Sequence, residues 1–129
     1  DAIKAGGVTL IEITMSVRGA IDVIKELTQK YKDEIILGAG TVLDPETGRA
    51  ALLAGAQFIV TPTLNLELIE LCHRYSAVIV PGAMTPTEIL TAWNAGADRV
   101  KVFPAAQLGG PEYIKAIRGP LPQIPGRGR

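Results

Sequence analysis

Cysteine, net charge and long apolar runs are all scarce in this sequence. Cys72 is the only cysteine, so no disulfide can form within the chain, which fits a reducing cytoplasm. Thirteen basic and thirteen acidic residues cancel, which removes the simplest basis for binding nucleic acid or an anionic membrane. The apolar runs are far shorter than the ~20 residues of a membrane-spanning helix, and the start of the chain has no signal-peptide pattern. We therefore expect a cytoplasmic protein with no nucleic-acid or membrane partner.

What the sequence does contain is an alternation of two kinds of segment. Its 129 residues are 47% hydrophobic and 20% charged, values that suit one globular domain with a real core. Short β-rich runs, separated by helical patterns, cover residues 8–14, 34–41, 57–62, 77–82 and 99–104. Strands that alternate with helices predict βαβ units, a parallel sheet and right-handed crossovers.

Helix ends are marked by residues with known capping preferences. Residues 17–31 place apolar side chains at helical spacing. Residues 44–46 (Asp-Pro-Glu) and 85–88 (Thr-Pro-Thr-Glu) each combine an N-cap residue, a first-turn proline and an acid, the second at capping-box spacing. Gly55 and Gly96 stand where a glycine is expected to end a helix. The final stretch GPLPQIPGRGR is rich in Pro, Gly and Arg and predicts a loop.

The two faces of the predicted sheet differ in chemistry. Successive side chains of a strand point to opposite faces, so Glu12 lies on the face opposite to Ile11 and Ile13. Lys101 likewise lies opposite to the valines on either side of it. A parallel sheet with helices on one face and ionisable groups on the other is typical of a barrel interior, whereas a doubly wound sheet requires apolar residues on both faces. The sequence therefore favours an α/β fold of the (βα)8 TIM-barrel type.

Lys101 is the residue whose position most needs a reason. An ammonium buried among apolar side chains costs several kcal/mol unless it is paired or loses its proton. The neutral amine can attack a carbonyl to form a Schiff base, and a carboxylate such as Glu12 can then move protons. Both residues lie in the C-terminal halves of their strands, where barrels build active sites. The pattern also allows a buried structural ion pair between the two.

Several segments together resemble the 2-keto-3-deoxy-6-phosphogluconate (KDPG) aldolase family. Members of this family often also act on 4-hydroxy-2-oxoglutarate. The resemblance extends from about residue 3 to residue 122, and the motifs occur in the order found in the family. They are GGVTLIEIT, GAGTVLDP, GAQFIVTPTLN, VIVPGAMTPTEI and VKVFPAAQLGGPEYIKAIRGPLP.

The resemblance implies roles for individual residues. Lys101 matches the Schiff-base lysine of the family and Glu12 its general acid/base. The other matches are substrate-binding positions: Thr41 and Pro62 at the pyruvyl end, Phe103 beside the lysine, and Gly82 and Thr14 as further lining residues. An ordinary strand-end threonine remains an alternative for Thr41, and core packing remains one for Phe103. The implied chemistry uses no cofactor and no metal, and a lone His73 is interpreted as a solvated helix residue.

Segments found at both ends of the family's barrel have no counterpart in this sequence. A complete barrel has eight strands and ~200 residues or more, and this sequence provides five strand patterns. We expect residues 1–125 to form a partial βα-barrel aldolase domain, and residues 126–129 to form a tail outside the family. Such a domain would leave the strands at 8–14 and 99–104 as unpaired edges and its inner face open. We therefore expect a homo-oligomer that completes or covers the barrel, with a trimer as the first expectation because complete relatives are commonly trimeric.

The function implied by the resemblance is that of a lyase, a class I aldolase. It would cleave a small sugar acid or keto acid, of the KDPG or 4-hydroxy-2-oxoglutarate type, to pyruvate and an aldehyde. The alternative is a weakly active or inactive barrel fragment that serves as a self-associating scaffold or a keto-acid binding module. The presence of Lys101 and Glu12 favours the enzyme, whereas the missing strands favour the fragment.

Overall fold

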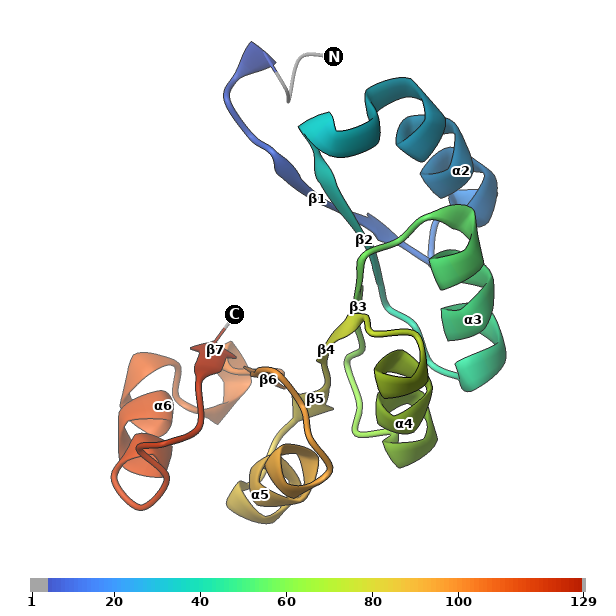
Figure 1. Cartoon of the computed structure of the whole chain (residues 1–129). Helices are drawn as coiled ribbons and strands as arrows, with labels where there is room; N and C mark the ends of the chain where they lie inside the picture. Colours follow the sequence, from blue (N-terminus) through green and yellow to red (C-terminus); the bar gives the residue numbers. More distant parts are fainter. Residues whose placement is uncertain (1–4, 129) are drawn as a thin grey trace.

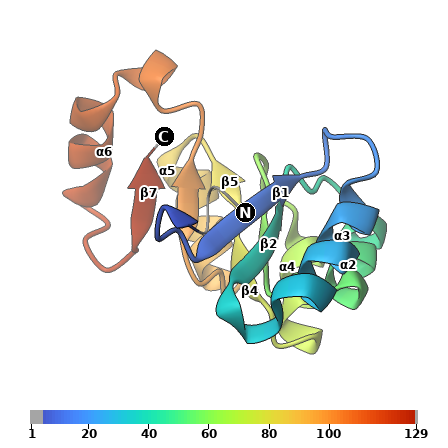
Figure 2. The same cartoon turned by 90° about the horizontal axis from the view of Figure 1, so that it is seen from above.

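The computed structural model describes residues 5–128, in which helices lie along the outer side of a curved layer of parallel strands (Figure 1). Seen from above, α2, α3 and α4 occupy one part of this arc and α6 lies at its other end (Figure 2). The elements are β1 (Leu10–Thr14), α2 (Ala20–Tyr31), η1 (Lys32–Glu34), β2 (Ile36–Gly40), α3 (Pro45–Ala54), β3 (Phe58–Val60), α4 (Leu66–Arg74), β4 (Val78–Val80), β5 (Gly82–Ala83), α5 (Pro86–Asn94), β6 (Val100–Val102), η2 (Ala106–Leu108), α6 (Pro111–Arg118) and β7 (Gly126–Gly128). Within the described residues, no helix is long and apolar enough to cross a membrane. The predicted alternation of strands and helices is confirmed.

The strands form two hydrogen-bonded sheets, in the orders β1-β2-β3-β4 and β5-β6-β7, and every pairing is parallel. The strand predicted as one run at residues 77–82 is divided into β4 and β5 at Pro81. Proline has no N–H to donate, so it interrupts the ladder. Each half still has a partner, since β4 pairs with β3 and β5 pairs with β6. The predicted position of this strand is confirmed, but its continuity is wrong.

The C-terminal stretch contains a strand that the sequence did not predict. β7 pairs in parallel with β6, so the prediction of a loop is wrong for residues 126–128. The prediction that the strand at 99–104 is an unpaired edge is also wrong, because β6 lies between β5 and β7. A ladder is built from backbone groups, so even a segment of glycine and arginine can pair with an open edge. Among the described strands, β1 does occupy the predicted edge position.

Buried apolar side chains form two clusters on the helical side of the strands. The larger cluster includes Leu37 and Ile59, which are 2% and 0% exposed. The smaller cluster includes Val100 and Val102 and is covered by side chains of α5 and α6. Leu64 packs against both clusters and joins them into one core. Because this core uses only one face of the strands, the other face remains free to form a site.

The predicted helix caps are confirmed. The Asp44 side chain accepts a hydrogen bond of 2.6 Å from the backbone N–H of Thr47. Thr85 and Glu88 form a complete capping box at the start of α5. Gly55 ends α3 with a φ of 115°, and Gly96 follows the C-cap residue of α5 with a φ of 93°. Glycine adopts such positive φ values without strain, which explains why it stands at both positions.

Asp44 gives a testable link between one cap and stability. Hydrogen bonds from the backbone and side chain of Thr47 hold the pKa of Asp44 below its usual value of 3.8. Asp44→Ala should lower the free energy of unfolding at neutral pH by about 1 kcal/mol, the typical cost of losing an N-cap. Because the folded pKa is depressed, this contribution is complete above pH 3.8 and is lost as the pH falls through the lower folded value.

Urea unfolding of both proteins between neutral pH and pH 3 measures this difference. Asp33→Ala is the matched control, because it removes an exposed carboxylate from η1, a helix without a side-chain cap hydrogen bond. A deficit for Asp44→Ala that stayed constant down to pH 3 would contradict the assigned role of the ionised carboxylate.

Candidate functional site

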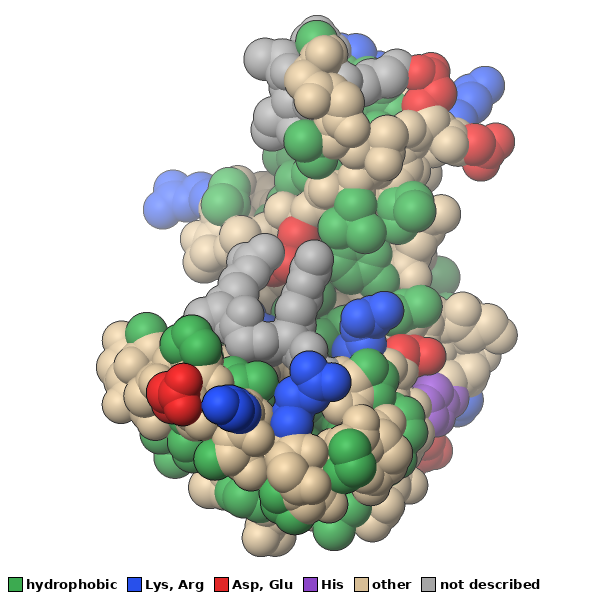
Figure 3. Space-filling view, turned by 90° about the vertical axis from the view of Figure 1, so that its left-hand side faces the viewer, with side chains coloured by type: hydrophobic (Ala, Val, Ile, Leu, Met, Phe, Trp, Pro, Cys, Tyr) green, Lys and Arg blue, Asp and Glu red, His purple; other side chains and the backbone are tan. Residues whose placement is uncertain are grey.

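Side chains alternate along β1 as the sequence predicted. Ile11 and Ile13 pack against the larger core cluster on the helical side. Leu10 and Glu12 point the other way, into a cavity of about 620 Å³. The hollow of the molecule, which contains hydrophobic surface, faces the viewer in Figure 3. The inner side of the strand layer is therefore where a functional site can form.

Glu12 and Lys101 line this same cavity, although they are far apart in the sequence. Most of the wall is apolar, and three of its polar side chains carry charge. The lining residues are Leu10, Glu12, Ile36, Gln57, Phe58, Val60, Val78, Val80, Arg99 and Lys101. The cavity thus brings together a lysine amine, a carboxylate and a second cationic group in a mostly apolar setting.

Lys101 owes its orientation to its neighbours in β6. Val100 and Val102, 0% and 4% exposed, are buried in the smaller core cluster, which turns Lys101 to the inner face. The lysine is half-buried, and its Nζ lies 5.1 Å from the centroid of the Phe103 ring. This is within the range at which an aromatic face attracts a cation. The prediction that Phe103 lies beside Lys101 is confirmed.

The direction of the Glu12 side chain depends on Gly40, a residue of the neighbouring strand β2 that has no side chain. The Glu12 backbone pairs with Gly38, but its carboxylate extends over Gly40, two residues further along β2. A Cβ built on Gly40 would lie 2.6 Å from Glu12 Cδ and 2.9 Å from Cγ. The carboxylate therefore points toward the carboxyl ends of the strands. Among the described residues no ion pair joins Glu12 to Lys101, so the structure does not support the alternative of a structural pair.

The other predicted site residues do not line the cavity itself, and all of them except Gly82, the first residue of β5, lie at or just beyond the carboxyl end of a strand. Thr14 ends β1, and its hydroxyl shares a hydrogen bond with that of Ser16. Gly82 is the register partner of Lys101, and a Cβ built on it would collide with the carbonyl of Pro62. Thr41, Pro62 and Phe103 each follow a strand directly or within two residues.

Thr41 has a backbone conformation that is unusual for its residue type. It is exposed and has a φ of 57°, in the left-handed region. A β-branched residue rarely adopts this region, and such strain costs about 1–3 kcal/mol and is concentrated at functional sites. This observation favours a functional position for Thr41 over an ordinary strand-end threonine.

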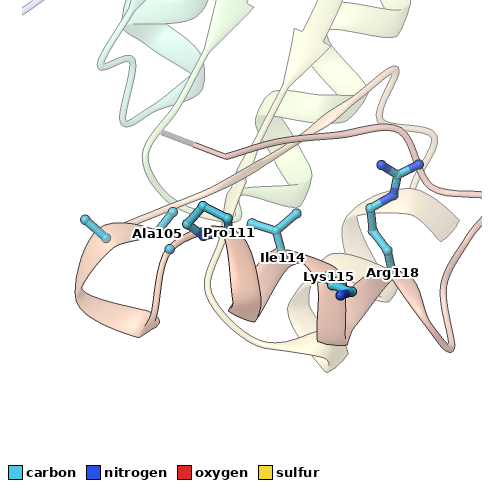
Figure 4. Close-up of a pocket in the computed structure, with 7 residues that line it drawn as sticks. Ala105, Pro111, Ile114, Lys115 and Arg118 are labelled. Atoms are coloured by element: carbon cyan, nitrogen blue, oxygen red, sulfur yellow. The ribbon is translucent and has the colours of Figure 1, made fainter.

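A second cavity, of about 720 Å³, lies beside α6 (Figure 4). Lys115 and Arg118 are its only charged lining residues among the described side chains, and no carboxylate accompanies them. Ala105, Pro111 and Ile114 supply an apolar wall. None of the predicted site residues lines this cavity, so the inner-face cavity is the candidate active site.

Sequence reasoning missed several residues of the inner-face cavity. Arg99 and Phe58 line it, and Gly38 and Gly40 leave the space that Phe58 and Glu12 occupy. The sequence did contain a signal for this space. The two glycines of the GAG segment lie on the same face of β2 as Ile36, which predicts that this part of the cavity wall has no side chains. Over the described part of the chain, no group of three or more His, Cys, Asp and Glu residues could hold a metal ion.

Comparisons with known proteins give consistent results over nearly the whole chain. A family model described as KDPG and KHG aldolase matches residues 1–126. The 2-dehydro-3-deoxy-phosphogluconate aldolase of Pseudomonas aeruginosa is 41% identical over 124 residues, which are 96% of this chain and 56% of that protein. The chain therefore spans little more than half the length of this relative.

Solved structures match the fold as well as the sequence. The KDPG aldolase of Legionella pneumophila, with pyruvate captured as a covalent carbinolamine intermediate, has a TM-score of 0.92 at 31% identity. That match covers 98% of this chain and 61% of the other. A cube-shaped protein cage designed by fusing symmetric oligomeric domains matches with a TM-score of 0.88 at 37% identity, over 96% of this chain and 46% of that one. On these grounds, the chain belongs to the KDPG and KHG aldolase family.

Proposed function

We propose that this protein is a class I aldolase that releases pyruvate from a 2-keto acid of the KDPG or 4-hydroxy-2-oxoglutarate type. The observation that carries the proposal is the meeting of Lys101 and Glu12 in one mostly apolar cavity on the inner face. A lysine nucleophile and a carboxylate base are the two groups that such a reaction requires. The family match supports the same reaction.

In the proposed reaction, Lys101 Nζ attacks the C2 carbonyl of the substrate to form a carbinolamine. Loss of water then gives an iminium, which withdraws electrons from the C3–C4 bond. As this bond breaks, its electron pair remains on C3 and an aldehyde leaves. Protonation of C3 and addition of water then release pyruvate and regenerate the free amine.

Glu12 is the proposed carrier of protons in these steps. Its carboxylate can take the proton of the C4 hydroxyl as the C3–C4 bond breaks, and the resulting acid can protonate C3 afterwards. Its extension over Gly40 favours this role, because it brings the oxygens toward the carboxyl ends of the strands. The steps use only amine and carboxylate chemistry, so the proposal includes no metal and no cofactor.

The substrate would bind at the carboxyl ends of the strands, next to the part of the cavity that Glu12 and Lys101 line. We assign Thr41 and Pro62 to the pyruvyl end, Phe103 to packing beside the lysine, and Gly82 and Thr14 to further lining positions. Four of them lie at the carboxyl ends of strands, and Gly82 pairs with Lys101, which supports this assignment. Arg99 gives the cavity a permanent cationic group besides the reactive amine, which suits an anionic keto acid.

Pyruvate release is the direct test of this function. The purified chain is incubated with KDPG and with 4-hydroxy-2-oxoglutarate, and pyruvate is measured by reduction with lactate dehydrogenase and NADH. Formation of pyruvate from either substrate, in proportion to protein concentration, is the expected result. Covalent trapping of pyruvate without turnover would favour the keto-acid binding module, and neither trapping nor turnover would favour an inactive scaffold.

We also propose that the inner face is covered by another copy of the chain, in a homo-oligomer for which a trimer is the first expectation. Leu10, Ile36 and Val78 on this side are 53%, 48% and 46% exposed, and soluble monomers rarely expose continuous apolar surface of this kind. Among the described strands β1 is also an edge, since it pairs with β2 alone, and edge strands are prone to pair with another chain. A matching chain within a cage of fused symmetric oligomeric domains supports self-association.

Substitution on the inner face should disrupt this assembly. Val78→Asp places a charge on the proposed contact, and burying an unpaired charge is costly. The variant should therefore shift toward monomer, or unfold if the monomer is not stable alone, as is common when an obligate interface exceeds about 2,000 Å². Leu53→Asp is the control, since Leu53 is 62% exposed on α3 outside the cavity. Light scattering over a dilution series measures the mass. A wild-type chain that remains a folded monomer at all concentrations rules out the proposed assembly.

The proposed location is the cytoplasm. Cys72 is buried in α4, and its burial together with the charge of Asp98 raises the pKa of the thiol to about 11. A protonated, buried thiol is unreactive and needs no oxidising compartment. Small phosphorylated or keto sugar acids of the proposed type are also the substrates expected of a metabolic enzyme in that compartment.

A further inference from the structure

β2 has almost no side chains on its inner face. Ile36, Gly38 and Gly40 alternate on this side, so only the first of the three reaches into the cavity. The strand lies between β1 and β3. Side chains from both neighbours can therefore lean over its backbone, and each of the two glycines receives one of them.

The Phe58 ring fills the first of these spaces. Phe58 is the register partner of Gly38, and a Cβ built on Gly38 would collide with its ring. The ring is 8% exposed and thus firmly packed. Glu12 is paired with Gly38 from the other side, in the same cross-strand row. Because the ring already covers Gly38, the Glu12 side chain cannot lie flat across its own partner.

The Glu12 side chain uses the second space instead. Its carboxylate lies against Gly40, the register partner of Thr14, where a Cβ would be 2.6 Å from Glu12 Cδ. A parallel strand rises about 3.3 Å per residue, so a shift of two residues along the strand moves the carboxylate by about 6.6 Å. This shift directs the carboxylate from the middle of the sheet toward the ends that carry Thr41 and Phe103.

We propose that Gly40 is a positioning residue, whose missing side chain holds the space in which the Glu12 carboxylate must lie for proton transfer. The catalytic consequence rests on the function proposed above, whereas the placement itself does not. The atoms nearest to an added Cβ belong to the end of the flexible Glu12 side chain. Gly40→Ala should therefore displace the carboxylate and leave the fold intact, since alanine is tolerated in a strand at least as well as glycine.

Two reactions of pyruvate separate the lysine from the carboxylate. Borohydride trapping reports formation of the iminium by Lys101. Exchange of the pyruvate methyl protons in deuterium oxide also requires the base to remove a proton from that iminium. In Gly40→Ala, exchange should fall by about 10- to 100-fold, a part of the usual contribution of general acid–base catalysis, while trapping stays within about twofold of wild type. Gly119→Ala is the control, because Gly119 has a φ of −53° at the end of α6 and lies outside the cavity.

A double-mutant cycle gives a readout that a general structural effect would not produce. In Glu12→Gln the base is already absent, so displacing the amide with a Cβ at position 40 removes no further proton transfer. Gly40→Ala should therefore have little further effect on exchange in the Glu12→Gln background, which is strong coupling. Equal losses in both backgrounds, or a parallel loss of trapping, would overturn the positioning role.

Crystal structures of the wild type and of Gly40→Ala test the position of the Glu12 carboxylate directly, whether or not the protein is an aldolase. If the wild type neither traps pyruvate nor exchanges its protons, the aldolase function is wrong, and the structures still test the placement. The expected result is a carboxylate over residue 40 in the wild type and a displaced one in the variant. A carboxylate found elsewhere in the wild type, or unmoved in the variant, overturns the proposal.

Discussion

Lys101→Ala is expected to abolish aldol cleavage, with a loss of about 10⁴-fold or more, the scale seen when a covalent nucleophile is removed. No other described lysine lines the inner-face cavity, so no neighbouring amine can replace Lys101 there. The fold should persist, because Val100 and Val102 carry the packing of β6 and the lysine itself is half-buried. Steady-state release of pyruvate measures the loss, and circular dichroism checks the fold.

Lys115→Ala is the matched control for this variant. It removes an exposed lysine that lines the separate cavity beside α6. Its rate of cleavage should equal that of the wild type. If Lys101→Ala retained more than a tenth of the wild-type activity while remaining folded, Lys101 would not be the nucleophile.

Glu12→Gln has the second largest expected effect and a different pattern. The amide is close in size and can still lie over Gly40, but it cannot accept and return a proton. Cleavage should slow by at least ~100-fold, the lower bound for general acid–base catalysis. Borohydride should still trap pyruvate on Lys101, because the amine remains in place.

Glu112→Gln provides the control, since this exposed glutamate of α6 lies outside the inner-face cavity. It should neither slow cleavage nor alter trapping. Near-normal turnover in Glu12→Gln would assign the proton transfer to another group. Loss of trapping along with turnover would instead indicate that Glu12 acts by placing Lys101.

The main features of the fold were predictable because they depend on local patterns. Alternation along β1 and β6 assigned Glu12 and Lys101 to the face opposite the helices, and the structure confirms this. Cap residues such as Asp44 and Thr85 marked helix starts correctly, because a cap is a contact within a few residues. Both kinds of signal act over short distances and can be found in a single sequence.

The parts that escaped prediction depend on contacts between distant segments. β7 forms because the edge of β6 is available, and nothing in its own residues favours a strand. The break at Pro81 was visible in the sequence, but its consequence depends on which strands lie on either side. The direction of the Glu12 side chain depends on Gly40 and Phe58, and a strand pattern gives only the face on which a side chain lies.

The central claim is that the amine of Lys101 reacts with the carbonyl of a keto acid. Reduction of the wild-type protein with borohydride in the presence of pyruvate, followed by intact mass and peptide mapping, tests it most directly. We predict that each chain gains the mass of one reduced pyruvyl group and that the modified peptide carries it at Lys101. Modification at a different lysine, or no modification of a folded sample, would contradict the account.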